Sequence, residues 1–193
     1  MDDAAVARGE VTIAASLDRF VKKGSVAASD AAAIQSRVTG TTDFNTAAHA
    51  DLVIEAVFED ESVKRYLFHR LDGICPPSAI LASNTSSISI TVLAAATSRP
   101  DRVIGMHFFN PVPVMGLVEI VRGARTSDAT YEIVASLARA LGKTPVSVHD
   151  YPGFVSNRIL MPMLNEAIFC LMEGVADREA IDTVMKLGMA HPM

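Results

Sequence analysis

Asp51-Leu52-Val53-Ile54-Glu55-Ala56-Val57 is a short, almost continuous apolar run, and it decides the fold class. Such a run is typical of a strand that is buried on both faces of a parallel sheet. Directly after it, the apolar residues Val63, Leu67, Leu71 and Ile74 follow a helical period. A buried strand followed by a helix is the repeating unit of a wound α/β sheet.

The same alternation continues along the chain. It predicts further strands at residues 79–82, 103–106 and 144–148, and a helix at residues 126–141. From residue 154 onward, only helical periodicity remains. The fold is therefore predicted to be α/β.

Two parts are expected on this basis. Residues 1–150 would form an incomplete Rossmann-type parallel sheet, and residues 151–193 would form the start of an all-α domain. The chain opens with predicted helices at residues 6–23 and 28–38, where a wound sheet would usually open with a strand. It stops at residue 193, directly after another predicted helix. We therefore expect a fragment of a longer fold.

Charge and composition exclude several classes of protein. The formal net charge of -5 argues against a general nucleic-acid binder. No apolar run approaches the ~20 residues that a membrane helix needs, and the acidic start is no secretory signal. Cys75 and Cys170 lack the spacing of metal ligands, so no metal is expected. We expect a soluble intracellular protein. The cytoplasm is the favoured location, and the mitochondrion and the peroxisome stay open as alternatives.

Polar residues follow the predicted strands where ligands bind in open α/β sheets. Ser83-Asn84-Thr85-Ser86-Ser87 follows the strand at 79–82, and His107 follows the strand at 103–106. Glu119 is a lone carboxylate inside the apolar run at 117–121. These loops are where we expect the chemistry.

A charge inside an apolar run is costly unless it is paired, and His107 is the candidate partner of Glu119. A carboxylate that holds one imidazole nitrogen fixes the tautomer and leaves the other nitrogen as a usable general base. Structural interpretations stay open. His107 could be a structural histidine with its hydrogen bonds satisfied, Glu119 could face solvent at a sheet edge, and the Ser/Asn/Thr cluster could be an ordinary turn. A Ser/His/Glu hydrolase built on Ser86 lacks the G-x-S-x-G elbow.

Five segments in this order resemble the 3-hydroxyacyl-CoA dehydrogenase family, nearest to its short 3-hydroxybutyryl-CoA dehydrogenases. They are Ser83-Asn84-Thr85-Ser86-Ser87, residues 105–115, Leu117-Val118-Glu119, Gly153-Phe154-Val155-Ser156-Asn157-Arg158, and Met185-Lys186-Leu187-Gly188 with His191-Pro192-Met193. The resemblance covers essentially the whole chain. It implies an NAD-dependent oxidoreductase that interconverts (S)-3-hydroxyacyl-CoA and 3-oxoacyl-CoA in fatty-acid β-oxidation. The expected substrate is 3-hydroxybutanoyl-CoA.

The resemblance also implies catalytic roles. His107 matches the base that takes the 3-hydroxyl proton as the hydride leaves for NAD, and Glu119 matches the carboxylate that orients it. Ser86 matches the serine that bonds the reacting oxygen and lies near the nicotinamide. Asn157 matches the asparagine that helps hold the acyl part of the substrate.

Ligand contacts follow from the same resemblance. Glu59, Lys64, Ser86 and Asn110 match positions that contact NAD, while Ser16 and Lys23 match positions that contact the CoA moiety. The substrate site would thus combine these two residues with Ser86 and Asn157. The intact enzyme is expected to be a homodimer.

The sequence departs from the family in its first part. No G-x-G-x-x-G phosphate-binding turn is present, and the acid that holds the ribose cannot be assigned to Asp2 or Asp3, so the choice between NAD and NADP stays open. We therefore expect this chain to bind NAD weakly and to turn over slowly or not at all. Two alternatives remain: a truncated non-catalytic or structural protein, and a sugar-acid dehydrogenase of the same superfamily.

Overall fold

A computed structural model describes residues 2–192 of the chain. The described chain divides into two compact units, one that ends at Ala48 and one that begins at His49. This division does not test the predicted domain boundary at residue 150, which stays a prediction. The candidate catalytic residues His107, Glu119, Ser86 and Asn157 all belong to the second unit.

The first unit is built on two helices, α1 (Asp3–Lys22) and α2 (Ala28–Gln35), as the sequence predicts, and the 3-10 helix Phe44–His49 runs across its end. The carboxylate of Asp2 caps α1 by accepting a hydrogen bond from the backbone of Ala5 at 2.8 Å. Neither helix contains a buried residue in the described chain. Hydrogen bonds from Gly40 to Glu10 and from Thr42 to Asp3 join the segment after α2 back to α1.

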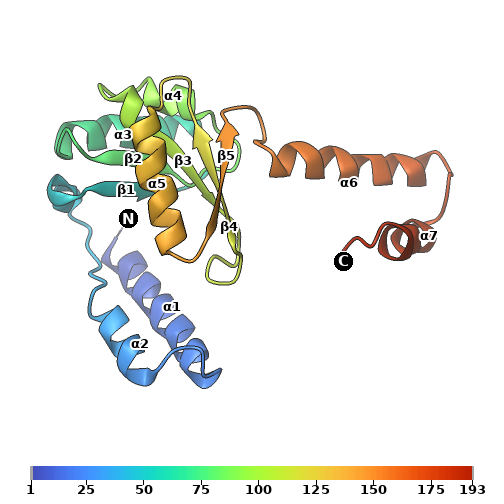
Figure 1. Cartoon of the computed structure of the whole chain (residues 1–193), viewed down its shortest axis with the longest axis horizontal. Helices are drawn as coiled ribbons and strands as arrows, with labels where there is room; N and C mark the ends of the chain where they lie inside the picture. The colour runs from blue at the N-terminus through green and yellow to red at the C-terminus, as the bar shows by residue number, and fades with distance from the viewer. Residues whose placement is uncertain (1, 193) are drawn as a thin grey trace. The chain divides into compact units, whose positions relative to one another are not determined.

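The second unit is organised around one sheet (Figure 1). Within residues 2–192 its strands, in spatial order, are β1 (Leu52–Glu55), β2 (Ile80–Ser83), β3 (Val103–Phe108), β4 (Leu117–Arg122) and β5 (Thr144–His149). The predicted α/β class is confirmed, and all pairings but one are parallel. β3 and β4 pair antiparallel, because the segment that joins them is too short for the crossover that a parallel pair needs.

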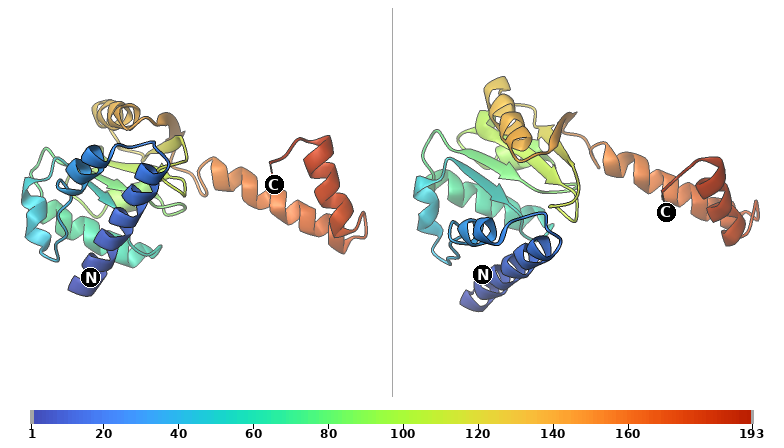
Figure 2. Two further views of the ribbon diagram at one scale, coloured as in Figure 1. Left: turned by 90° about the horizontal axis from the view of Figure 1, so that it is seen from below. Right: turned by 60° about the horizontal axis from the view of Figure 1, so that its bottom comes forward.

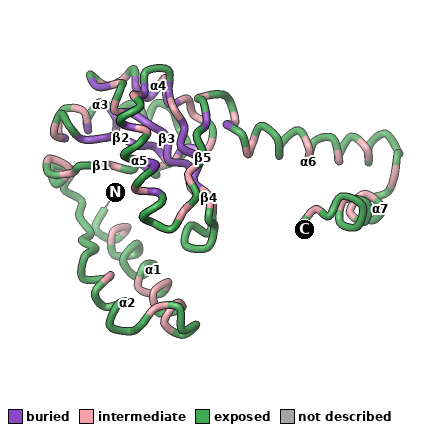
Figure 3. Tube along the Cα trace, viewed as in Figure 1, coloured by how far each residue is buried: buried purple, intermediate pink, exposed green. Residues whose placement is uncertain are grey.

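Helices cover both faces of the sheet (Figure 2). One face packs against α5 (Asp128–Ala140), and the other carries α3 (Glu61–Ile74) and the short α4 (Ile90–Ala94). Figure 3 shows that the buried residues gather in the strands and in the helices that touch them. This layering is the arrangement that the strand and helix alternation predicts.

The two-residue period of β3 decides which side chains face which helix. Ile104 and Met106 join a core cluster with Val134 of α5. Gly105 lies on the opposite face, against Ile90 of α4. His107, two residues further on, points to the same face as Gly105, so the candidate base lies on the side of the sheet that carries α4.

β1 is less buried than expected. Leu52 and Val53 are only half-buried, Ile54 is 41% exposed, and Glu55 is the strand's buried residue. The expectation of burial on both faces was wrong because, in the described chain, β1 is an edge strand with β2 as its single neighbour. Its apolar run therefore lacks the second strand that would cover it.

The last part of the chain is helical, as predicted. α6 (Ser156–Met172) and α7 (Arg178–Thr183) lead into a π-helical turn at Val184–Gly188, and none of the three contains a buried residue within the described range. Pro162 lies inside α6. Across residues 2–192, no helix combines the length and apolarity needed to cross a membrane.

Gly105 gives a test of this packing. A Cβ at this position would lie 2.7 Å from Cβ of Val121 and 3.1 Å from Cδ1 of Ile90. Gly105→Ala should therefore lower the free energy of unfolding by about 1–3 kcal/mol, the usual cost of overpacking a core. Gly116→Ala is the control, since nothing lies within 4 Å of that position. Equal urea midpoints for both variants would show that α4 does not pack closely against β3.

Candidate functional site

His107 and Glu119 form a buried pair across two neighbouring strands. The antiparallel register of β3 and β4 places them directly opposite each other, so their side chains share one face of the sheet. Nδ1 of His107 lies 2.7 Å from Oε2 of Glu119, and the two residues are only 6% and 2% exposed. An ionised carboxylate only accepts hydrogen bonds, so Nδ1 carries the proton and Nε2 is left for chemistry.

The start of α6 completes the surroundings of Glu119. The backbone N–H of Ser156 donates to Oε1 at 3.1 Å, and the Ser156 hydroxyl donates to Oε2 at 3.2 Å. The His107 ring is flanked by Phe109 at 4.8 Å and Phe154 at 5.7 Å between ring centres. The carboxylate is thus fixed from two sides, and aromatic rings limit the rotation of the imidazole.

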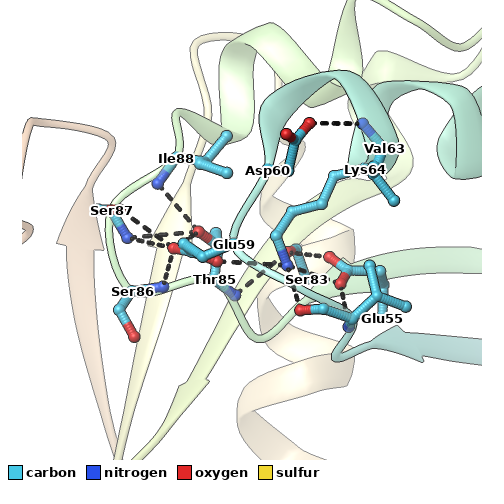
Figure 4. A network of polar contacts seen from close by, with 11 residues as sticks. Glu55, Glu59, Asp60, Val63, Lys64, Ser83, Thr85, Ser86, Ser87 and Ile88 are labelled. Carbon is cyan, nitrogen blue, oxygen red and sulfur yellow. Dashed lines mark hydrogen bonds and ion pairs between the residues drawn. The ribbon is translucent and has the colours of Figure 1, made fainter.

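A serine-rich turn follows β2 beside this pair, and Glu59 organises it (Figure 4). Oε1 of Glu59 accepts hydrogen bonds from the Thr85 hydroxyl at 2.5 Å and from the backbone of Ser86 at 2.9 Å. It also accepts from the backbone and the hydroxyl of Ser87, at 3.1 and 3.0 Å. One carboxylate oxygen therefore accepts four hydrogen bonds from residues 85–87 of the turn.

These contacts change the acidity of Glu59. Partial burial acts to raise its pKa, but the hydrogen bonds from Thr85, Ser86 and Ser87 and the charge of Lys64 act together in the other direction. The net pKa lies below the ordinary value of 4.5. Glu59 is therefore held as a carboxylate at neutral pH.

Two further hydrogen bonds tie the turn to its neighbours. The side-chain amide of Asn157, in α6, donates to the backbone oxygen of Ser86 at 3.2 Å. The side-chain oxygen of Asn84 accepts from the backbone N–H of Phe108 at 2.9 Å, which joins the end of β2 to the end of β3. Ser86 is consequently placed by contacts from three parts of the second unit.

An open cavity of about 840 Å³ adjoins this turn. Its lining includes Glu59, Ser86, Ser87, Gly153, Asn157 and Arg158. Its volume is in the range of small-molecule sites, and it lies beyond the carboxyl end of β2, where open α/β sheets bind ligands. The structure therefore offers a polar turn that lines a cavity of ligand size. His107 and Glu119 are not among the residues that line this cavity, and the hydrogen bond from Phe108 to Asn84 links the end of the His107 strand to the turn.

Comparison with known proteins identifies this arrangement. Residues 1–151 match the sequence model of the 3-hydroxyacyl-CoA dehydrogenase NAD binding domain, and residues 153–193 match that of the 3-hydroxyacyl-CoA dehydrogenase C-terminal domain. The chain belongs to the 3-hydroxyacyl-CoA dehydrogenase family. The family predicted from the sequence is thereby confirmed.

Individual relatives agree. A probable 3-hydroxybutyryl-CoA dehydrogenase of Bacillus subtilis is 56% identical over 177 residues, which are 92% of this chain and 62% of the relative. A 3-hydroxybutyryl-CoA dehydrogenase of Clostridioides difficile is 50% identical over 92% of this chain and 63% of its own length. The crystal structure of (S)-3-hydroxybutyryl-CoA dehydrogenase from Ralstonia eutropha superposes with a TM-score of 0.97 at 53% identity, covering 99% of this chain and 68% of that one. The chain thus spans somewhat less than two thirds of these curated relatives.

The residues that the sequence singles out lie at several places in this family member. Ser86, Asn157 and Glu59 meet at the turn, and His107 meets Glu119. Asn110 lies on the exposed loop between β3 and β4. The ammonium of Lys64 is buried, bonded to two carboxylates and a carbonyl. Ser16 and Lys23 belong to the first unit, and their assignment to CoA stays a prediction.

Sequence reasoning assigned no individual role to three residues that shape the site. Ser156 donates hydrogen bonds to Glu119, and no local pattern in the sequence predicts that contact. Glu55 and Ser83 form part of the buried network around Lys64. Glu55 could have been found, because it stands in an apolar run just as Glu119 does.

The residues present fit one end of the expected cofactor. Ser86 and Glu59 face the cavity with polar groups at the carboxyl ends of the strands, where the nicotinamide end of a dinucleotide would lie. The sequence holds no glycine-rich turn to cradle a pyrophosphate. A contact between Lys64 and the cofactor stays a prediction. NAD is the cofactor of the family's N-terminal domain, whose sequence model covers this part of the chain.

Glu59 gives a pH-dependent prediction. Its pKa is lower in the folded chain than the ordinary value, so its contribution to stability is full above about pH 4.5 and is lost as the pH falls through the folded value. Glu59→Gln should therefore destabilise the protein at pH 7, and the difference from the wild type should shrink below about pH 4.5.

Urea unfolding across this pH range measures the difference. Glu132→Gln, an exposed carboxylate on α5, is the control and should change stability little at any pH. A Glu59→Gln variant that differs from the wild type by the same amount at every pH would contradict the ionised state of Glu59.

Proposed function

We propose that the protein is an NAD-dependent oxidoreductase that interconverts (S)-3-hydroxyacyl-CoA and 3-oxoacyl-CoA. The observation that carries the proposal is the buried His107–Glu119 pair, held at 2.7 Å beside the Ser86 turn. Membership of the 3-hydroxyacyl-CoA dehydrogenase family supports the reaction type. Both observations agree with an alcohol oxidation that needs one positioned base.

His107 is the base of this reaction. Glu119 fixes the proton on Nδ1, so Nε2 accepts the proton of the 3-hydroxyl group during oxidation and returns it during reduction. Glu119 also offsets the positive charge that the imidazole gains. Bound NAD supplies the hydride acceptor, and the protein's task is to hold the reacting carbon and the base in the right geometry.

Ser86 and Asn157 position the substrate. The Ser86 hydroxyl bonds the reacting oxygen, and Asn157, which is bonded to the Ser86 backbone, orients the acyl part from the start of α6. Both residues line the cavity, so they reach a bound ligand without rearrangement of the sheet. These roles follow the resemblance stated above and are consistent with where the side chains lie.

Short acyl chains are the proposed substrates, with 3-hydroxybutanoyl-CoA first. The support comes from the relatives in Bacillus subtilis, Clostridioides difficile and Ralstonia eutropha, whose names specify 3-hydroxybutyryl-CoA. A homodimer is proposed as well, because α6 exposes large apolar side chains that a second copy would cover. These include Ile159, Leu164, Ile168 and Met172.

Oxidation of NADH in the presence of acetoacetyl-CoA tests the base. In the full-length protein expressed from its gene, His107→Ala should lower kcat by about 10²–10⁴, the usual weight of general acid–base catalysis. His69→Ala is the matched control, because His69 is an exposed histidine on α3. An unchanged kcat for His107→Ala would remove His107 from the mechanism, and activity without the CoA moiety would point to a different substrate class.

Glu119→Gln tests the orienting carboxylate. Glutamine keeps the shape of the side chain but removes the charge that supports the protonated imidazole, so kcat should fall by at least about tenfold. KM for acetoacetyl-CoA should change much less, since Glu119 faces His107 rather than the cavity. The Glu132→Gln protein again serves as the control. A rise in KM alone would assign Glu119 to binding instead.

A further inference from the structure

A buried ionic network lies behind the Ser86 turn (Figure 4). Glu55 at the end of β1 and Lys64 in α3 form an ion pair of 2.7 Å, with side chains only 2% and 1% exposed. Such a pair gives up the hydration of two charges, and an apolar pair of similar size often serves stability as well or better. Stability alone therefore does not explain this pair, and its contacts with the turn are the place to look for a role.

The ammonium of Lys64 is surrounded by oxygen atoms. Nζ donates hydrogen bonds to Oε1 of Glu55 at 2.7 Å and to the backbone oxygen of Val57 at 3.3 Å. It also forms an ion pair with Glu59, whose Oε2 lies 3.3 Å away. Lys64 thus links the buried Glu55 to the half-exposed Glu59, which collects the donors of the turn.

Glu55 reaches the same turn by a second route. Its Oε2 accepts a hydrogen bond from the Ser83 hydroxyl at 2.6 Å, and that hydroxyl accepts from the backbone N–H of Thr85 at 3.1 Å. Oε1 accepts from the backbone of Val57 at 2.6 Å, which fixes the carboxylate to its own loop. Both oxygens of Glu55 are therefore committed, one toward Lys64 and one toward Thr85.

We propose that Glu55 is a positioning residue for the reaction, acting through Lys64 and Ser83 on the turn that carries Ser86. The inference rests on the proposed function, because it concerns the placement of the serine that bonds the reacting oxygen. Glu55 touches neither the cavity lining nor the His107–Glu119 pair.

The network contains two carboxylates, Glu55 and Glu59, around one ammonium, Lys64. Glu59 must stay ionised to accept four hydrogen bonds from the turn, and Lys64 is the cation within reach that favours its ionised form. Lys64 in turn is buried, and the second carboxylate, Glu55, holds its ammonium in place. Removal of the Glu55 charge should shift Lys64 and loosen the turn.

Steady-state kinetics of the full-length protein with acetoacetyl-CoA and NADH test this inference. Glu55→Gln should lower kcat by about 10–100-fold, since misplacement of a positioning group by about 1 Å has effects of that size. KM for acetoacetyl-CoA should change less than about threefold, because Glu55 itself does not line the cavity. An unchanged kcat in a folded Glu55→Gln protein would overturn the proposal while the proposed function stands.

A double-mutant cycle with Ser86→Ala separates positioning from general destabilisation. If Glu55 acts through Ser86, the double variant should be about as slow as the slower single variant, because the two changes remove the same interaction. If the fold-loss of kcat in the double variant equals the product of the losses in the two single variants, Glu55 acts independently of Ser86. That result would overturn the proposal. If the wild-type protein has no activity, the proposed function is wrong, and this inference is wrong as a consequence.

Two further variants control for folding. Asp72→Asn breaks another largely buried ion pair, Asp72–Arg99, which lies away from the turn, and it should lower stability without a comparable loss of kcat. Ser83→Ala is the milder second variant if Glu55→Gln does not fold. It removes only the Thr85 route, and it should reproduce part of the loss of kcat. A Ser83→Ala protein with wild-type kcat would overturn the proposal in that case.

Discussion

The need to satisfy buried carboxylates shapes this site more than any other constraint. Glu119 and Glu55 are 2% and 5% exposed, and each would be strongly destabilising without partners. Glu119 obtains His107 from the neighbouring strand and Ser156 from α6. Glu55 obtains Lys64 from α3, along with Ser83 from β2. Satisfying these two charges therefore fixes the relative positions of the strands and helices that carry the candidate site.

The antiparallel step between β3 and β4 makes the first of these pairs possible. With a parallel crossover, the residue opposite His107 would come from a distant part of the chain. The short connection instead brings Glu119, twelve positions later, into direct register with His107. The two-residue period of the strands then places both side chains on the face that carries α4. Local chain geometry thus supplies a base and its orienting acid with little conformational freedom to lose.

Much of the fold follows from the sequence, because strand and helix periods are local properties. The runs at 79–82 and 103–106 became β2 and β3, and the cost of an unpaired charge brought Glu119 to attention. Long-range hydrogen bonds were not visible in the same way. Ser156 joins Glu119 across 37 positions, and that contact depends on how α6 leaves the sheet. The exposure of β1 was also missed, since a single run does not state how many neighbours its strand has.

The candidate site lies where the two family domains meet. The matched sequence models divide between residues 151 and 153, yet Glu119 is bonded to Ser156 and the Ser86 turn is bonded to Asn157. Each side of the division therefore contributes groups that the other cannot replace. The sheet supplies the base and the turn, while the first residues of α6 fix the carboxylate and close one side of the cavity. It follows that the placement of α6 is coupled to both the acid–base pair and the turn, because its first residues are bonded to each of them.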